Sequence, residues 1–337
     1  MTPRWRWILL AILTVLALGG AGAFAVDAYL GYRERSTGPS QVATAAVLPT
    51  GPSVLFRNTA AGEGYGMLAS VALGEPAGPR TLTGTACDRV YRTGATVSCL
   101  RTVRGISTTF KAVAWDTGGQ GTGQESEWAL AGIPSRTRVS ADGLVATTSF
   151  VTGHSYAADG FSTETVIESP DGRDYGNLEK FTMTVGGREL TATDRNVWGV
   201  TFANDGDTFY ATVASGGSTW LMRGSLSART LDALAENAEC PSLSPDGGEV
   251  AYKKRRPGTT PAEWDIAVLD LGGGTERTIE LEDGIDDQLE WLDTDTLLYG
   301  QPRAGTVGDS DVWSIGTTPG ALPELFIEHA WSPSVQR

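Results

Sequence analysis

The stretch 240–252, CPSLSPDGGEVAY, decides the fold of this 337-residue chain. Its centre, SPDG at 244–247, has the composition of a β-turn. The proline ring presets φ at the first central position, the aspartate bonds nearby backbone amides, and the glycine accepts positive φ. Strand-forming residues flank the turn on both sides, so the stretch predicts a β-hairpin.

Altered copies of this hairpin recur along the chain. The turn returns as SADG at 140–143, as ANDG at 203–206 and, cut short by the C-terminus, as WSPS at 331–334. The same frame fits CDRVYRTGATVSC at 87–99, WGVTFANDGDTFYAT at 198–212 and WLDTDTLLYG at 291–300. Successive turns lie between 39 and 63 residues apart. Periods of about 40 to 50 residues with four short strands each are typical of β-propeller blades.

The two ends of the repeat region complete each other. Segments 53–57 (SVLFR) and 66–73 (GMLASVAL) resemble the second and third strands of a blade without a first strand, and 330–335 supplies that strand. The sequence therefore predicts an all-β fold, a six-bladed β-propeller with one blade closed by both chain ends, so that no sheet edge stays free. The alternative is two unrelated all-β domains with chance SxDG turns.

An apolar segment precedes the propeller. Residues 7–26 contain Thr14 as their one polar side chain, follow Arg4 and Arg6, and are long enough to span a bilayer as a helix. We therefore expect a cytoplasmic N-terminus at 1–6, a transmembrane signal anchor at 7–26, a stem at 27–50 and the propeller at 51–337. A small-x-small pattern at 23–25 leaves a cleaved signal peptide open.

Both alternatives export the propeller. We expect a single-pass cell membrane protein with the propeller on the extracytoplasmic side, or a secreted protein if the segment is cleaved. The net charge of −14 disfavours binding to nucleic acid or to anionic lipid head groups. The basic run at 253–256 (KKRR) is interpreted as a solvated blade edge.

The chain has three cysteines, which can pair in an exported protein. Cys87 and Cys99 flank one predicted hairpin turn, and a disulfide between them would contribute ~3 kcal/mol in the chain-entropy model. A two-residue loop at 93–94 would point their side chains to opposite faces of the sheet, so we expect a loop of three or five residues. Cys240 is expected to be a buried free thiol.

Few residues offer catalytic chemistry. The two histidines, His154 and His329, fall in different blades and exclude a His-rich metal centre. A G-x-S-x-G elbow and a P-loop are absent from the sequence, and the glycines of 119–123 are interpreted as a linker. The acidic run 282–295 lacks EF-hand spacing and is interpreted as a solvated loop between blades. We therefore predict no catalytic residue, no metal site and no cofactor.

The longest gap between turns contains an extra piece, 169–196, with an apparent hairpin at 181–192. Insertions that decorate a propeller are where binding usually takes place. The candidate partner-binding residues are Arg173, Asp174, Tyr175, Lys180, Arg188 and Trp198. A structural flap that covers the blade is the other interpretation.

The motif SPDGGEVAY at 244–252 and its weaker copies resemble the WD40-like propeller repeat of TolB-type proteins, over 53–335. The layout, with a membrane-proximal N-terminus followed by these motifs, is similar to the TolB-like translocation proteins of actinobacteria. The resemblance implies a propeller held outside the cytoplasmic membrane and used for protein contacts. TolB proper has an α/β domain before its propeller, for which the stem leaves no room, so the partners of TolB do not carry over.

Two functions therefore remain open. The first is a non-catalytic scaffold that docks a protein or a cell-envelope component and is tied to the membrane by its N-terminal helix. The alternative is an exported propeller enzyme of the hydrolase, lyase or lactonase type with carboxylates in its central channel. That enzyme needs acidic side chains on the first strands of several blades. Those strands instead carry apolar side chains, namely Val90, Val139, Val200, Leu243 and Leu289.

Overall fold

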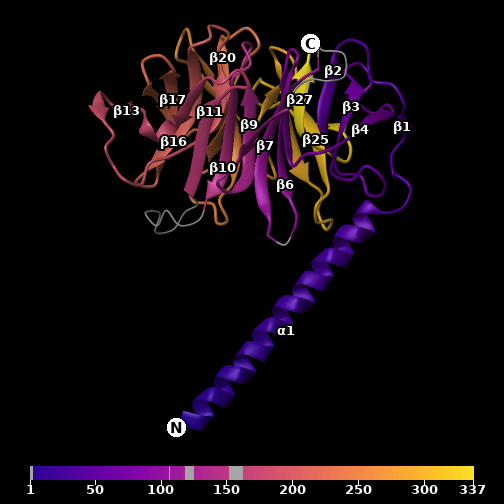
Figure 1. The fold of residues 1–337 in the computed structure, drawn as a ribbon. Coiled ribbons are helices and arrows are strands. Elements are labelled where there is room, and N and C mark those ends of the chain that lie inside the picture. Colours follow the sequence, from indigo (N-terminus) through magenta and orange to yellow (C-terminus); the bar gives the residue numbers. More distant parts are fainter. Residues whose placement is uncertain (1–2, 106, 118–124, 152–161) are drawn as a thin grey trace.

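Six β-sheets stand around a common axis and form a propeller, and one long helix leaves its lower face (Figure 1). This is a computed structural model, and it describes residues 3–105, 107–117, 125–151 and 162–337. The fold class predicted from the turn repeat is confirmed. His154 and the glycines of 119–123 lie outside the described residues.

Each blade is an antiparallel meander, because short strands alternate with tight turns along the chain. The second blade contains β5 (Arg89–Thr93), β6 (Thr96–Val103), β7 (Thr109–Asp116) and β8 (Ser126–Ala129). The third contains β9 (Ile133–Val139), β10 (Val145–Val151), β11 (Ser162–Glu168) and β12 (Asp174–Asn177). The fifth contains β19 (Glu239–Leu243), β20 (Glu249–Arg255), β21 (Trp264–Asp270) and β22 (Glu276–Ile279). The sixth contains β23 (Glu290–Trp291), β24 (Thr296–Pro302), β25 (Ser310–Gly316) and β26 (Glu324–Ile327).

The first blade is closed by both ends of the propeller, as the sequence predicts. Its innermost strand is the C-terminal β27 (Ala330–Gln336), which pairs antiparallel with β2 (Ser53–Asn58), and Val54 lies opposite Val335. β3 (Met67–Ala72) and β4 (Arg80–Ala86) follow, and the two-residue β1 (Thr44–Ala45) adds to the outer edge parallel to β4. The stretch predicted as a stem thus contributes one short strand to the ring.

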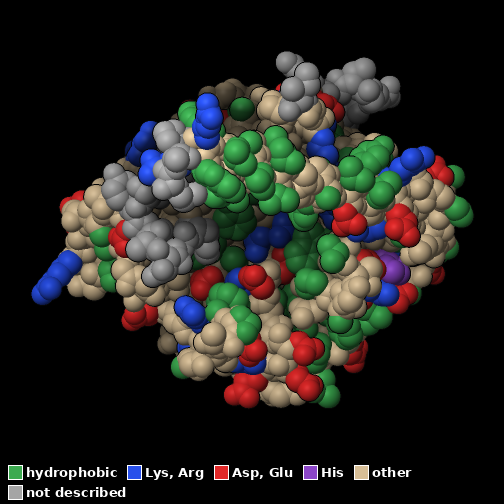
Figure 2. All heavy atoms as spheres, turned by 90° about the horizontal axis from the view of Figure 1, so that it is seen from below, with side chains coloured by type: hydrophobic (Ala, Val, Ile, Leu, Met, Phe, Trp, Pro, Cys, Tyr) green, Lys and Arg blue, Asp and Glu red, His purple; other side chains and the backbone are tan. Residues whose placement is uncertain are grey.

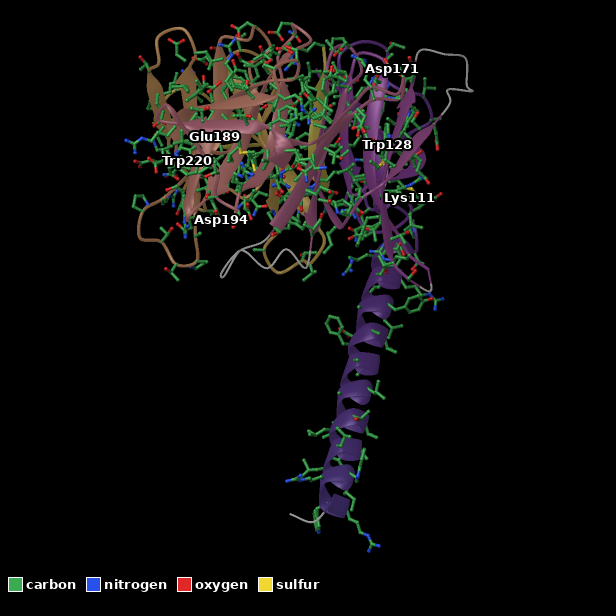
Figure 3. All side chains as sticks on the ribbon, turned by 60° about the vertical axis from the view of Figure 1, so that its left-hand side comes forward. Lys111, Trp128, Asp171, Glu189, Asp194 and Trp220 are labelled. Atoms are coloured by element: carbon green, nitrogen blue, oxygen red, sulfur yellow. A yellow bond between two sulfur atoms is a disulfide. The ribbon has the colours of Figure 1, made fainter. Side chains whose placement is uncertain are left out.

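The predicted insertion is divided between two blades. Its first part forms β12, the outer strand of the third blade, and the 3₁₀ turn η1 (Leu178–Lys180) follows. The predicted hairpin is present as β13 (Thr182–Val185) and β14 (Arg188–Glu189). It extends the fourth blade, whose own strands are β15 (Asn196–Phe202), β16 (Thr208–Ser215), β17 (Ser218–Ser225) and β18 (Thr230–Glu236). β13 pairs parallel with β18, and Figure 3 shows Glu189 on the outer side of this blade.

The turns that begin with serine share one hydrogen-bond pattern. In SPDG the amide of Gly247 donates to the carbonyl of Ser244 at 2.9 Å, and the hydroxyl of Ser244 donates to Asp246 at 2.6 Å. Gly247 has φ of 76°, in the left-handed region that favours glycine. SADG repeats both bonds, and so does a further SPDG at 169–172, which closes the turn between β11 and β12. The motif therefore occurs in the turn between the first and second strands of a blade and also in a turn between the third and fourth strands, so it does not mark only the start of a blade.

The helix α1 (Pro3–Ser36) continues ten residues beyond the apolar segment 7–26. Its apolar stretch is fully exposed and is long enough to cross a membrane. Backbone bonds fix its upper end to the propeller: Gly62 donates to the carbonyl of Arg35, and Glu63 donates to that of Gly38, both at 2.8 Å. A membrane-spanning α1 would therefore hold the propeller close to the bilayer surface.

The disulfide between Cys87 and Cys99 is present, and its Cα atoms lie 5.5 Å apart. The loop length predicted for it is wrong, because Thr93 pairs with Thr96 and leaves a two-residue turn. The amide of Asp88 donates to the carbonyl of Leu100, and Arg89 is also the strand partner of Leu100. This bulge places two residues opposite one, which reverses the side to which Cys87 points. Cys240 is a buried free thiol, as predicted.

Candidate functional site

The centre of the propeller is a channel lined by six strands, one from each blade. β27, β5, β9, β15, β19 and β23 each contact the next in this order, and β23 contacts β27 again. Since side chains alternate across a strand, every second residue of these strands points to the axis. Those residues are not all apolar, and the charged ones lie in two layers.

The upper layer is an ion pair between Arg138 of β9 and Glu290 of β23. Arg138 Nη2 lies 3.3 Å from Glu290 Oε2, and the two side chains are 6% and 4% exposed. Arg138 Nη2 also donates to the carbonyl of Leu289 at 2.6 Å, and its Cζ lies 4.2 Å from the ring centre of Tyr91. Burial raises the pKa of Glu290, while Arg138 and the amide of Val335 favour its charged form.

The lower layer joins Arg89 of β5 to Asp287. Arg89 Nη1 lies 2.8 Å from Asp287 Oδ1, and the Asp287 side chain is 1% exposed. The amide of Gly300 donates to the second carboxylate oxygen at 3.0 Å, and a Cβ on Gly300 would lie 2.7 Å from that oxygen. Burial, with Arg136 nearby, lowers the pKa of Arg89 to about 10, and Asp287 opposes this shift.

Two further cations belong to the lower layer. Lys253 is 3% exposed and its Nζ lies 2.6 Å from Asp286 Oδ1. Arg136 is 9% exposed, donates from Nη1 to the carbonyl of Ser135, and has no partner for Nε among the described residues. Figure 2 shows Lys and Arg side chains at the bottom of the hollow in the centre of the lower face. Four cations thus meet three carboxylates in the channel.

These charges correct two expectations. The basic run 253–256 was expected to be solvated, but Lys253 is buried, with its Nζ over the ring of Trp264 and paired with Asp286. The acidic run 282–295 was expected to be a solvated loop, but Asp287 and Glu290 are buried against arginines. Arg136 and Arg138 were not predicted as site residues. Their spacing of two residues could have indicated the charged layer, because residues two apart on a strand point to the same face of that strand.

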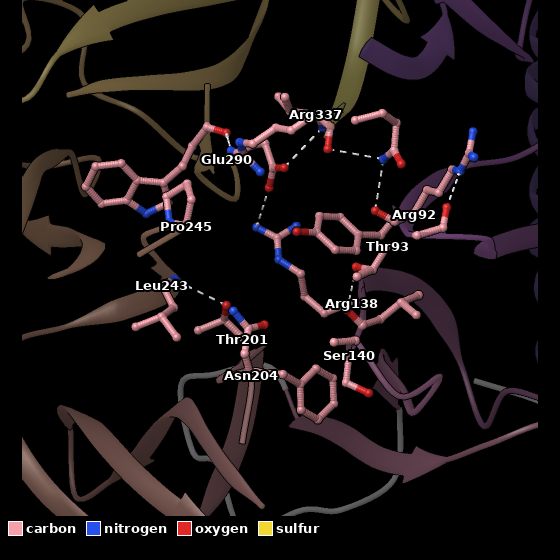
Figure 4. A pocket seen from close by; sticks show the side chains of 18 of the residues that line it. Arg92, Thr93, Arg138, Ser140, Thr201, Asn204, Leu243, Pro245, Glu290 and Arg337 are labelled. Atoms are coloured by element: carbon pink, nitrogen blue, oxygen red, sulfur yellow. Dashed lines mark hydrogen bonds and ion pairs between the residues drawn. The ribbon is translucent and has the colours of Figure 1, made fainter. Parts of the chain in front are cut away.

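A cavity of about 670 Å³ opens above the upper layer (Figure 4). The C-terminus is part of its lining and lies on the face away from α1 (Figure 1). Its rim consists of hairpin turns from several blades and the C-terminus, and Arg138 and Glu290 lie inside it. The rim is rich in hydroxyl, amide and backbone groups, contributed among others by Thr93, Ser140, Thr201, Asn204, Ser244 and Gln336. Gln336 donates to the carbonyl of Arg92 at 2.9 Å, and Arg337 to that of Trp291. We call this cavity the mouth.

One side-chain carboxylate, that of Glu290, lies among the residues that line the mouth. It forms an ion pair with Arg138 and accepts a hydrogen bond from the amide of Val335. Within the described residues, no group of three or more His, Cys, Asp or Glu side chains is placed to hold a metal ion. His329 lies between the sixth and first blades, with Nδ1 2.8 Å from Asp309 Oδ2.

The six candidate residues of the insertion are not brought together. Arg173 and Asp174 flank the start of β12, and Arg173 is held by ion pairs to Asp142 and Asp171. Tyr175 packs partly against the core, while Lys180 and Arg188 are exposed. Trp198 lies on the inner strand β15 and is 6% exposed. The insertion therefore offers separate side chains, and Arg173 is joined through Asp142 to the turn 140–143, which also lines the mouth.

Solved structures with the same architecture are known. TolB from Acinetobacter baumannii is 14% identical, with a TM-score of 0.58, and the match covers 86% of this chain and 68% of that one. A chain of the nidogen/laminin complex is 10% identical, with a TM-score of 0.53 over 85% and 98% of the two chains. A puromycin-hydrolyzing peptidase of Mycobacterium tuberculosis is 15% identical, with a TM-score of 0.50 over 87% of this chain and 46% of that one.

At these identities the likeness shows the fold alone. No protein-family model and no curated protein sequence matches the chain. The fold is shared by proteins with different functions, so function has to be argued from this chain's own site.

Proposed function

We propose that the protein is a membrane-anchored, extracytoplasmic propeller that binds a segment of another protein at the mouth and does no chemistry on it. The observation that carries the proposal is the state of the charges inside the mouth. Arg138 and Glu290 neutralise each other, and two further arginines, Arg92 and Arg337, line the mouth together with hydroxyl, amide and backbone groups. Such a lining offers hydrogen bonds to a polypeptide without a free acid or base.

The position of the mouth supports the same role. It lies on the face opposite α1, so a protein anchored through α1 would present it away from the bilayer. The disulfide between Cys87 and Cys99 is consistent with export, because such bonds persist in oxidising compartments. This role agrees with the resemblance to TolB-like translocation proteins, which implies protein contacts outside the cytoplasmic membrane.

The enzyme alternative has weaker support. It would rely on Asp287 and Glu290, but both carboxylates come from the sixth blade and each is paired with an arginine. The acids of a channel enzyme must be free to exchange protons with the substrate. Substrate turnover by the purified protein that is lost in both Asp287→Asn and Glu290→Gln would contradict our proposal.

Site-specific photocrosslinking in intact membranes tests where a partner binds. One crosslinker replaces Asn204 at the rim of the mouth, a second replaces Lys180 in the insertion, and a third replaces the exposed Glu280 as control. We expect Asn204 to capture a distinct protein, identified by mass spectrometry, and Glu280 to capture none. Capture at Lys180 without capture at Asn204 would move the partner to the insertion.

The same preparation tests the anchor. We expect peptides from 7–26 to be recovered from the mature protein in the membrane fraction. A mature protein that begins beyond residue 26 would show that the segment is a cleaved signal peptide.

A further inference from the structure

A second cavity, of about 490 Å³, lies where α1 meets the propeller, and we call it the junction pocket. Three tyrosines line it: Tyr29 and Tyr32 from the helix and Tyr65 from the turn between β2 and β3. Tyr32 and Tyr65 pack edge to face, with their ring centres 6.3 Å apart. The hydroxyl of Tyr65 donates to the carbonyl of Gly308 at 3.1 Å, which fixes the ring.

Four arginines surround these rings, although no two of them are neighbours in sequence. Arg35 and Arg57 stand over Tyr65, with Cζ 5.8 and 5.5 Å from its centre, and Arg104 stands over Tyr32 at 5.4 Å. Arg101 completes the lining. The pocket could not be predicted from the sequence, because these arginines come from the end of α1, from β2, and from β6 and the turn after it.

The pocket has more positive charge than its own carboxylates neutralise. Its lining carboxylate, Asp88, accepts bonds from the amide and hydroxyl of Thr102 at 2.7 and 2.6 Å. Arg101 forms an ion pair with Glu127, whereas Arg35, Arg57 and Arg104 have no ion pair with any carboxylate of the described residues. Guanidinium groups without a carboxylate favour an anion from outside the chain.

Hydrogen bonding singles out the same place. Across the described residues, five buried side-chain atoms lack a hydrogen-bond partner, and all five are arginine Nε atoms. Three of them, on Arg35, Arg57 and Arg101, belong to the junction pocket. A buried donor without an acceptor costs free energy, so a ligand with several acceptor oxygens would be favoured there.

The helix sets the depth of the pocket. Tyr29 and Tyr32 follow the end of the apolar segment by about 5 and 9 Å along the axis, at ~1.5 Å per residue. The head-group layer outside the hydrocarbon core is about 5 to 8 Å thick, so the pocket opens at the level of the lipid phosphates. Side chains of a helix tilt toward its N-terminus, which here is the membrane side, and tyrosines are enriched at this level.

We propose that the junction pocket binds the phosphodiester of an anionic phospholipid of the extracytoplasmic leaflet. The guanidinium groups of Arg35 and Arg57 hold the phosphate oxygens, and Arg101 and Arg104 contribute from the rim. The inference rests on the proposed membrane anchor and adds a ligand at the opposite face from the mouth. It makes the pocket a local exception to the acidic character of the chain as a whole.

Lipid retention by the full-length protein tests the proposal. The purified protein, in a neutral detergent, is mixed with phosphatidylglycerol, with phosphatidylcholine or with inorganic phosphate, and bound molecules are counted by native mass spectrometry. We expect one phosphatidylglycerol to be retained with about tenfold higher affinity than phosphatidylcholine. Inorganic phosphate in excess should not displace it, because the lipid chains also contact α1.

The variant Arg35→Gln/Arg57→Gln should lose about tenfold in affinity for phosphatidylglycerol. Arg104→Gln, on an exposed turn where it cannot disturb folding, should weaken binding in the same direction. Arg188→Gln removes the same charge from the exposed strand β14 and should bind as the wild type does.

Three outcomes would overturn the proposal: equal retention of phosphatidylglycerol by the wild type and both pocket variants, an equal loss in Arg188→Gln, or binding of free phosphate in preference to lipid. None of these outcomes bears on the proposed protein partner at the mouth, because binding of that partner is tested separately by crosslinking at Asn204. Loss of residues 7–26 from the mature protein would instead remove the anchor.

Discussion

At the scale of single residues, the channel is held by charges that need each other. Arg138 and Glu290 are both nearly inaccessible to water, and each provides the other's opposite charge. Burying such a pair is not in itself strongly stabilising, but removing one partner leaves an uncompensated charge in a place of low dielectric constant. Replacing one member of the pair should therefore destabilise the fold more than replacing both members with apolar residues.

We predict that Glu290→Gln lowers the free energy of unfolding by about 3 kcal/mol, because Arg138 keeps its charge and loses its counter-ion. Chemical denaturation followed by tryptophan fluorescence measures the change. Glu280→Gln, which removes the same charge from an exposed site, is the control and should change stability by less than about 0.5 kcal/mol. The double variant Glu290→Leu/Arg138→Met should recover most of the loss, and equal stability of Glu290→Gln and the control would contradict the argument.

Glu168, at the end of β11, gives a pH dependence. Burial, with Asp174 and Glu164 nearby, raises the pKa of its carboxyl from 4.5 to about 7 in the folded protein. The folded state therefore binds more protons than the unfolded state between these values, and this group's contribution to stability falls as the pH rises through that range. Glu168→Gln removes the charge that burial disfavours.

We therefore expect Glu168→Gln to melt at a higher temperature than the wild type at about pH 8 and to show no gain at about pH 4. Thermal unfolding monitored by circular dichroism at both pH values provides the comparison. Glu280→Gln should show no such difference between the two pH values. A gain of the same size at both would mean that the effect comes from packing and not from the carboxyl.

Residue-scale features were the hardest to predict from sequence. The turn glycines and aspartates were visible because each acts within four residues of its neighbours. The channel charges were not, because Arg89 and Arg138 reach Asp287 and Glu290 only after the ring has brought three blades together. The junction pocket is a stronger case, since its arginines come from three separate segments, namely the end of α1, β2, and β6 with the turn after it.

At the scale of elements, the hairpin β5–β6 shows what a pattern can and cannot determine. The strands and the pairing of Cys87 with Cys99 were predicted, whereas the loop length was wrong. The prediction of loop length assumed an unbroken strand ladder, and a bulge at Asp88, just after the first cysteine, breaks that ladder. A bulge depends on local backbone geometry that has no fixed sequence signature.

The disulfide gives the element-scale prediction. Cys87→Ser/Cys99→Ser should lose ~3 kcal/mol of unfolding free energy, because the bond closes a short loop in the unfolded chain. Denaturation of the oxidised wild type, the reduced wild type and the double variant measures this. We expect the reduced wild type and the double variant to have the same free energy of unfolding. Cys240→Ala should lose as much stability on reduction as the wild type does. A double variant as stable as the oxidised wild type would contradict the prediction.

At the scale of the whole molecule, the architecture was almost entirely predictable. Turn spacing gave the number of blades, and the lone strands near both ends gave the closure, because each feature repeats or completes a pattern. The position of the insertion in the chain was predicted, but its division between two blades was not. β12 completes the third blade, and β13 and β14 extend the fourth. A second SPDG at 169–172 is the feature of the sequence that marks β12.

The strand β27 also orders events in time. Its seven residues follow the strands of all the other blades in the chain, and they supply the innermost strand beside β2. The ring therefore cannot close until β27 has been synthesised, and until then β2 has an open edge. A chain cut between β26 and β27 would keep that edge exposed. Closure thus distinguishes chains that contain β27 from chains that lack it.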